Sequence, residues 1–361
     1  MNRYFEPKIQ FVDVKRITAI WAFSESAFGG ILHALKIPFT GIIIGGASVI
    51  FITLIAHYSE RKTNILKSTL LVILVKAFVS PHSPLTAYFA VGLQGVLGFV
   101  LFSLLPFKKI SSVLLGLLSL LFSALQRLIV LTILFGTTFW EAFDLFVNYI
   151  ISQIGIKNPT ISFSIIITSI YCFVHIVFGI YIGYKAGKIP DWLEIRTVKM
   201  RNEDIDYKQI QEHFERDKKR RLKRWWQRPS GIIILTASII LMIISYFSNE
   251  LGMAKSYQIL VMIIRSIIIS FVWFSIISPV VLQYISKFIE KNKLKHVDEI
   301  NFITNFFPSF RIIVNYCWTK SADKKGIKRI KSFMTDSLVL LLSLDVSNET
   351  NLHFTGQDTH R

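Results

Sequence analysis

Long apolar runs, separated by short polar stretches, dominate the hydropathy pattern of this 361-residue chain. A helix needs about 20 mostly apolar residues to cross the roughly 30 Å hydrocarbon core of a bilayer. The pattern predicts eight such spans, and the expected fold is therefore an all-α, polytopic membrane helical bundle. The predicted spans are residues 17–36, 38–57, 66–80, 84–106, 110–136, 162–185, 231–248 and 257–285.

The lysine and arginine residues alternate between these spans and predict a topology. They gather before the first span, after the second, between the fourth and fifth, between the sixth and seventh, and after the eighth. The intervening connections, including an expected loop over residues 140–160, hold few cations. Because cytoplasmic loops are enriched in Lys and Arg, we expect a multi-pass protein of the cell inner membrane with both termini in the cytoplasm.

The composition supports lipid, rather than water, as the main solvent. Hydrophobic residues make up 52% of the chain and charged residues only 18%, whereas soluble domains carry about 25% charged residues. The Lys and Arg residues that give the net charge of +18 lie mainly in the connections between spans. We therefore expect the lipid bilayer, and no nucleic acid, as a partner. The two cysteines suggest neither a disulfide framework nor a metal cluster. His33, His82 and His175 are irregularly spaced, and we expect no metal and no other cofactor.

A charged segment divides the apolar pattern into two membrane modules. The expected domains are a six-span module (1–186), a basic cytoplasmic linker (187–229), a two-span module (230–286), cytoplasmic amphipathic helices (287–346, with helices over 297–318 and 326–344) and a disordered tail (347–361). Directly before Trp225 and Trp226, the linker carries a cation cluster of the kind that contacts lipid headgroups beside a membrane. This cluster is Lys218, Lys219, Arg220, Arg221, Lys223 and Arg224.

Polar side chains inside the predicted spans are the candidate substrate-binding residues. They are Glu25, Lys76, Gln94, Gln126, Arg127 and His175. A charge at the centre of a span costs on the order of 2.5–3.5 kcal/mol and usually faces protein or water. If the six converge, they would bind a small polar or anionic solute, with Lys76 and Arg127 pairing with it. The alternative is an internal ion-pair network that only holds the helices together.

Small residues recur at four-residue intervals in the first two spans. Such spacing lets helices approach closely in lipid, and it serves either packing inside the chain or docking of a separate subunit. The residues are Ala22, Ser26, Gly30 and Ala34, followed by Gly41 and Gly45.

Sequence motifs of soluble enzymes are absent from the chain. It contains no G-x-x-x-x-G-K-[ST] phosphate loop, no H-E-x-x-H, no cysteine pair at zinc spacing and no G-x-S-x-G. We therefore expect no enzymatic activity and no catalytic residues. Movement of a solute against its gradient would need an ion gradient or a separate ATPase subunit.

The six-span module, with the small-residue face of its first helix and its outer polar side chains, resembles the substrate-binding S component of energy-coupling factor (ECF) transporters. The resemblance implies a vitamin-like solute and toppling against a scaffold subunit that contacts paired ATPases. A clear A-x-x-x-A is missing from the first helix. Residues 231–345 are similar to the scaffold T component, with residues 307–311, 321–326 and Arg329 near its coupling region, although the Ala-Arg-Gly or Ala-Arg-Ser signature is absent.

Two functional hypotheses follow. In the first, the protein is a transporter component that binds and translocates a small polar or anionic solute. In the second, it is a non-transporting membrane scaffold or assembly protein, whose linker and C-terminal helices recruit a cytoplasmic partner. A membrane-embedded enzyme acting on lipid is a more distant third.

Overall fold

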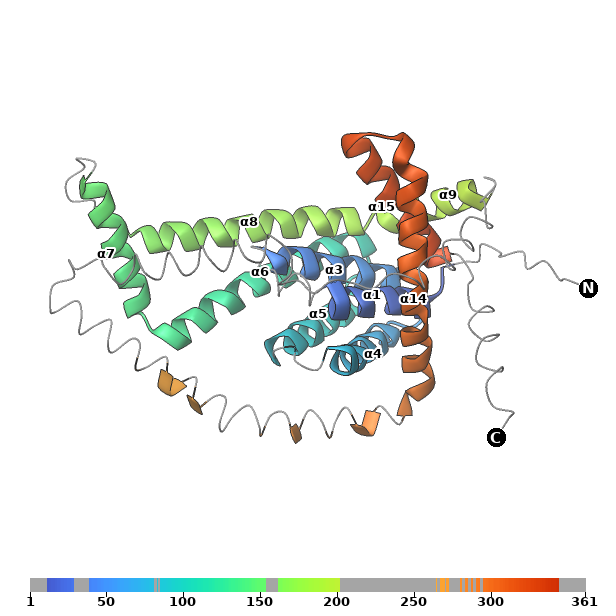
Figure 1. Ribbon diagram of the computed structural model, residues 1–361. Coiled ribbons are helices and arrows are strands. Elements are labelled where there is room, and N and C mark those ends of the chain that lie inside the picture. The colour runs from blue at the N-terminus through green and yellow to red at the C-terminus, as the bar shows by residue number, and fades with distance from the viewer. Residues whose placement is uncertain are drawn as a thin grey trace, which may run out of the picture. The chain divides into compact units, whose positions relative to one another are not determined.

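Helices form every regular element among the residues that the computed structural model describes (Figure 1). These residues are 12–28, 39–80, 83, 85–153, 162–201 and 295–343, with isolated positions between 264 and 292. Four of the helices are long and apolar enough to cross a membrane: α3 (Thr40–Tyr58), α5 (Leu85–Leu104), α6 (Lys108–Phe135) and α8 (Phe163–Ala186). They coincide with four predicted spans. The all-α class is confirmed, and these helices support membrane association.

The other predicted spans are less complete. Short helices occupy the first and third, namely α1 (Val14–Phe23) with the π-helix η1 (Ser24–Phe28), and α4 (Thr63–Val79). With 17 residues, α4 lies at the lower limit for crossing a bilayer. The seventh span, 231–248, lies outside the described residues, and the eighth, 257–285, is described only at isolated positions. The count of eight stays a prediction.

Two regions that the sequence did not predict as helical do form helices. The expected loop over 140–160 contains α7 (Thr138–Gln153), and the predicted linker begins with α9 (Ile189–Arg201). Both were missed because a search for runs of about 20 apolar residues passes over shorter helices. In α7, the apolar residues lie at helical spacing among polar ones, as in Phe139, Phe143 and Phe146.

Contacts along the chain define two compact units. The first contains Met1–Leu128, Ile166–His213 and Leu282–Arg361, and the second contains Ile129–Ile165 and Phe214–Val281. The second unit holds α7, where Asp144 accepts hydrogen bonds from the Ser162 hydroxyl and the Ser164 backbone N–H, both at 2.6 Å. The domain boundaries expected from the sequence stay a prediction.

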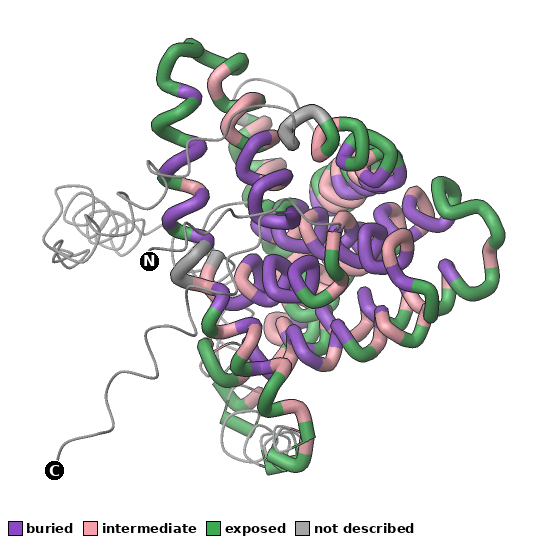
Figure 2. The backbone as a smooth tube through the Cα atoms, turned by 90° about the vertical axis from the view of Figure 1, so that its right-hand side faces the viewer, coloured by how far each residue is buried: buried purple, intermediate pink, exposed green. Residues whose placement is uncertain are grey.

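Helix α1 lies in the core of the first unit, against α3, α4 and α14 (Val297–Lys320). Figure 2 shows the buried segments gathered at the centre of the helices, and Ile17 and Trp21 are completely buried. Polar groups on α1 are buried too, and Thr18 donates a hydrogen bond of 2.8 Å to Ser68 on α4. A helix with polar groups on several sides is best satisfied when protein surrounds it, because lipid offers no hydrogen-bond partners.

Glycines bring α6 and α8 together at backbone distance. A Cβ at Gly116, Gly179 or Gly183 would overlap the backbone of the facing helix. This small-residue contact is typical of helices that associate in lipid. These three glycines lie outside the first two spans, for which the sequence predicts such contacts.

The two predicted C-terminal amphipathic helices are present. Helix α14 is followed by η5 (Ser321–Asp323) and α15 (Gly326–Ser343), and together they form a helical hairpin. Gly326 has a φ of +57°, which only glycine adopts readily, at the start of α15. Helix α14 runs across α1 rather than along it (Figure 1), and its Phe310 ring lies 4.8 Å from that of Phe23.

Candidate functional site

A polar pocket of about 150 Å³ lies at the end of the first unit where α3 and α5 begin and α4 ends. Side chains from η1, α3, α4, α5 and α6 line it. Its polar lining residues are Glu25, Thr40, Lys76, Thr86, Gln94, Ser119, Ser123 and Gln126. The pocket therefore brings polar side chains from five consecutive segments of the chain together in one place.

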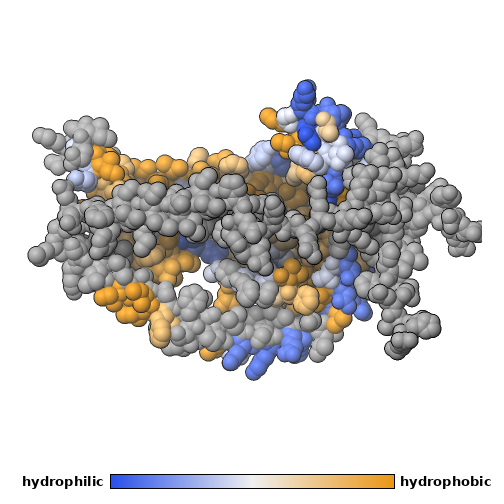
Figure 3. All heavy atoms as spheres, in the orientation of Figure 1, coloured by the Kyte–Doolittle hydropathy of each residue, from blue (hydrophilic) through white to orange (hydrophobic). Residues whose placement is uncertain are grey.

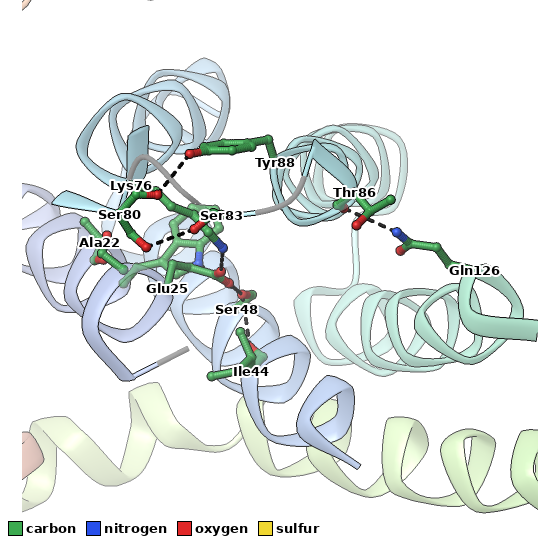
Figure 4. Close-up of polar contacts among 12 residues, drawn as sticks. Ala22, Glu25, Ile44, Ser48, Lys76, Ser80, Ser83, Thr86, Tyr88 and Gln126 are labelled. Carbon is green, nitrogen blue, oxygen red and sulfur yellow. Dashed lines mark hydrogen bonds and ion pairs between the residues drawn. The ribbon is translucent and has the colours of Figure 1, made fainter. Parts of the chain in front are cut away.

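A buried ion pair forms one wall of the polar pocket. Lys76 Nζ lies 2.7 Å from Glu25 Oε2, and the two side chains are only 6% and 3% exposed. The second carboxylate oxygen accepts a hydrogen bond of 2.7 Å from Ser48, which in turn accepts one of 3.1 Å from Trp21 Nε1. Figure 4 shows Glu25 between Ser48 and Lys76. Both oxygens are therefore satisfied, as a buried charge requires.

The π-helix at the end of α1 carries this carboxylate. Glu25 is the second residue of η1, and Ser26 donates a hydrogen bond of 2.7 Å back to the carbonyl of Ala22. A π-turn holds one more residue per turn than an α-helix, so it changes the direction of the side chains that it contains. Such turns occur often at functional sites. Here the turn carries Glu25, the only acidic residue that lines the pocket among the described residues.

Opposite the ion pair, amide and hydroxyl groups complete the pocket. Gln94 is buried, and its Nε2 would lie 3.2 Å from a Cβ at Gly45, so the missing side chain on α3 leaves room for this amide. Gln126 donates a hydrogen bond of 3.3 Å to the Thr86 carbonyl. The buried Ser119 hydroxyl has no hydrogen-bond partner among the described residues. A polar solute could supply that missing partner.

The structure brings four of the six predicted binding residues together. Glu25, Lys76, Gln94 and Gln126 line the polar pocket. Arg127 does not line it and is exposed. Successive helical residues point about 100° apart, so α6 can direct Gln126, but not Arg127 as well, into the pocket.

His175 also lies outside the lining of the polar pocket. It is buried on α8, where its Nδ1 lies 2.8 Å from the Tyr171 carbonyl oxygen. Its ring centroid is 4.3 Å from that of Tyr171 and 6.1 Å from that of Phe39. These contacts place His175 in a packed aromatic cluster.

The small residues of the first two spans serve packing inside the chain wherever they are described. Ala22 and Ser26 are buried, and Gly41 and Gly45 face Ser123 and Leu120 of α6. Gly30 and Ala34 lie outside the described residues, as does the predicted headgroup cluster Lys218, Lys219, Arg220, Arg221, Lys223 and Arg224.

Several pocket residues were missed from the sequence, although a signal was present. Ser119 and Ser123 precede the predicted Gln126 at intervals of four and three, which places all three on one face of α6. Ser48, which binds Glu25 but does not line the pocket, was also missed, because a single serine inside an apolar span gives no functional signal. Only its contact with Glu25 reveals a role.

The sequence-based expectations also concern possible metal ligands and the two cysteines. No group of three or more His, Cys, Asp or Glu side chains that could hold a metal ion occurs in the described part of the chain. Cys172 and Cys317 are free, and burial raises the pKa of the Cys317 thiol to about 11. That thiol is therefore protonated at neutral pH and is a poor nucleophile.

A second and larger cleft lies at the opposite end of the first unit. We call it the charged cleft; its volume is about 1050 Å³, and it is bounded by the start of α1, the α3–α4 connection and the start of α14. Lys67 Nζ lies 2.9 Å from Glu299 Oε1 there. This hydrogen bond is the main cause that holds the pKa of the Glu299 carboxyl below its ordinary value.

Comparisons with protein families, with functionally characterised proteins and with solved structures find no match to this chain.

Proposed function

We propose that this chain is a multi-pass membrane transporter component that binds a small polar or anionic solute in the polar pocket. One observation carries the proposal: a buried lysine–glutamate pair lines a pocket, together with amide and hydroxyl groups, between helices apolar enough to cross a membrane. Ionisable groups at membrane depth are costly and commonly mark solute or ion pathways.

The surface of the apolar helices supports a location in lipid. Helix α8 has a mean hydropathy of 2.2 over its most apolar stretch, yet only 11% of that stretch is buried. Large side chains such as Ile170 and Phe173 are exposed, and hydrophobic residues extend along α8 in Figure 3. An apolar surface of this extent would favour aggregation in water, whereas lipid solvates it.

The charge distribution supports an orientation for the pocket. Arg61, Lys62, Lys108, Lys109 and Lys185 lie at the end of the helices opposite the polar pocket. By the positive-inside tendency, that end faces the cytoplasm and the pocket faces outward. Eight spans with both termini inside complete this proposed topology.

Within the pocket, the ion pair provides a cation, Lys76, that can exchange one anionic partner for another. Glu25 neutralises Lys76 while the pocket is empty, and an anionic group of the solute takes over part of that role when it binds. Ser48 and Trp21 keep the Glu25 carboxylate hydrogen-bonded during the exchange. The solute is therefore held without leaving either buried charge unpaired.

Size sets a limit on the solute. Pockets for drug-sized ligands occupy about 300–1,000 Å³, and this pocket measures about 150 Å³. In the present arrangement of the helices, the pocket has room for a solute of only a few heavy atoms. A vitamin-like solute, as the resemblance to S components implies, needs the helices to separate, and a separate ATPase or scaffold subunit would supply the energy.

A second candidate function is the scaffold or assembly role. It is favoured by the Glu25–Lys76–Ser48–Trp21 network, because an internal pair whose carboxylate is bonded at both oxygens also suffices to fix helix packing. On this hypothesis the pocket binds nothing, and the C-terminal hairpin recruits a cytoplasmic partner.

Mass spectrometry of small molecules retained by the full chain in mild detergent tests the proposal, followed by solute-dependent thermal stabilisation. Ser119→Ala and Gln126→Ala leave the ion pair intact, so they should weaken solute binding while the protein still inserts and folds. Lys67→Met, at the opposite end of α4, is the matched control and should bind normally. If no solute is retained and none stabilises the protein, the scaffold hypothesis replaces this one.

A further inference from the structure

The tip of the C-terminal hairpin combines exposed apolar and basic side chains. On the first half of α15, Ile327, Ile330 and Met334 are 84%, 56% and 61% exposed. Their spacing of three and four residues places them in one row on the helix. A row of large apolar side chains on an exposed tip indicates a surface that binds something.

Basic residues surround this apolar row. From Trp318 to Thr335 the chain carries six cations, and Asp323 is the only acidic residue. The cations are Lys320, Lys324, Lys325, Lys328, Arg329 and Lys331, and all the lysines among them are exposed. On a helical projection of α15, Lys328 and Lys331 lie along one side of the row. An exposed apolar stripe flanked by lysines is the pattern of helices that lie in a membrane interface.

The inner face of the tip is held rigidly. The Trp318 ring meets Phe333 edge-on at 5.2 Å, and the Arg329 guanidinium lies 4.1 Å above the Trp318 ring. Further along the hairpin, Arg196 of α9 pairs with Asp336 at 3.1 Å. The apolar row therefore keeps its outward direction, since these contacts occupy the opposite side of α15.

The direction of α14 carries the tip away from the bundle of apolar helices. Glu299 pairs with Lys67 in the charged cleft, at the end of the bundle that carries the basic connections. From there α14 runs across α1, and the hairpin tip projects beyond α3 and α8 (Figures 1 and 3). In the proposed membrane location, a helix that crosses the spanning helices runs along the membrane plane, so its far end lies over neighbouring lipid.

We propose that the apolar row of α15 inserts into the cytoplasmic leaflet, with the surrounding lysines bound to anionic lipid headgroups. This inference rests on the proposed membrane location and orientation, but not on solute binding. The cytoplasmic leaflet is negatively charged and attracts basic segments beside membrane-spanning helices. The hairpin is thus an anchor whose attachment depends on lipid charge.

The test uses the full chain in nanodiscs, with Cys172→Ser removing the more accessible thiol and Met334→Cys carrying an environment-sensitive fluorophore. Cys317 is 1% exposed and stays unlabelled. In discs of equal parts phosphatidylcholine and phosphatidylglycerol, the emission should shift to shorter wavelength, and spin-labelled lipid should quench it. Discs of phosphatidylcholine alone should show a several-fold loss of quenching.

Charge variants distinguish an effect of the lysine charges from an effect on the fold. Changing Lys324, Lys325, Lys328 and Lys331 together to Gln should abolish the quenching, whereas changing the same four to Arg should retain it. A label that stays in water in both kinds of disc, or that is protected only after a cytoplasmic protein is added, overturns the proposal. Solute retention is measured on the same preparations, so a failure of solute binding is recorded separately.

Discussion

Helix α4 carries two lysine–carboxylate pairs, and they differ mainly in their surroundings. Lys76 and Glu25 lie 2.7 Å apart and are almost completely buried, while Lys67 and Glu299 lie 2.9 Å apart and are 50% and 28% exposed. Exposed pairs contribute little because water screens both charges. A buried pair instead makes each partner dependent on the other. We therefore expect the exposed pair at one end of α4 to tolerate substitution, and the buried pair at the other end not to tolerate it.

The largest expected effect comes from breaking the buried pair. Lys76→Met leaves the Glu25 carboxylate buried without its cation, and we expect a loss of about 3–5 kcal/mol in the free energy of unfolding. Denaturation of the purified protein in detergent measures this loss. The double variant Glu25→Gln, Lys76→Met is the control and should recover most of the stability. An unchanged Lys76→Met protein would show that the pair is not buried.

Removing the hydroxyl beside the pair should have an intermediate effect. Ser48→Ala takes a hydrogen-bond donor from Glu25 and an acceptor from Trp21, so we expect a loss of about 1.5–3 kcal/mol, as for hydrogen bonds to charged groups. The same denaturation assay applies, with Ser111→Ala, a buried serine bonded to backbone carbonyls, as comparison. Equal losses in both variants would contradict the special role of Ser48.

The exposed pair should tolerate disruption. Lys67→Met is expected to cost less than about 1 kcal/mol, because screening by water limits an exposed ion pair. Thermal melting of this variant beside Lys76→Met gives the comparison directly. A loss as large as that of Lys76→Met would mean that the charged cleft excludes water.

The smallest expected effect is a pH dependence at Glu299. Its pKa lies below the ordinary value of 4.5, chiefly through the hydrogen bond from Lys67, with His296 3.6 Å away on its other side. A carboxylate of lowered pKa stabilises the fold above the pKa of the unfolded chain, and this contribution is lost as the pH falls through the folded pKa. Melting curves between pH 6 and 3, which is about the range of carboxyl titration, should fall less steeply for Glu299→Gln than for the natural chain. Identical curves would contradict a stabilising ion pair between Lys67 and Glu299.

Most helices of the described chain could be anticipated because length and apolar content decide whether a segment can cross a bilayer. The two C-terminal helices followed from apolar residues at helical spacing. Helix α7 was missed because its apolar positions form a face and not a continuous run. Burial of Glu25 and Lys76 also followed from the sequence, since charges inside apolar spans avoid lipid.

Which candidate residues line the polar pocket depends on how each helix is rotated about its own axis. Gln126 lines the polar pocket and its neighbour Arg127 does not, a distinction that rests on how α6 turns toward α3 and α5. Likewise, Gly116 and Gly183 matter only because α6 and α8 face each other there. No pattern within a single helix contains that information.

The sequence by itself determined that this chain is helical, strongly apolar and basic between its apolar runs, because these properties belong to residue types and their spacing along one segment. Only the tertiary structure decided that Glu25 pairs with Lys76, that Ser48 and Trp21 complete the network, and that His175 packs among aromatic rings instead of lining the polar pocket. Those contacts join residues far apart in the chain, and they exist only where the packing of whole helices brings the side chains within hydrogen-bond distance.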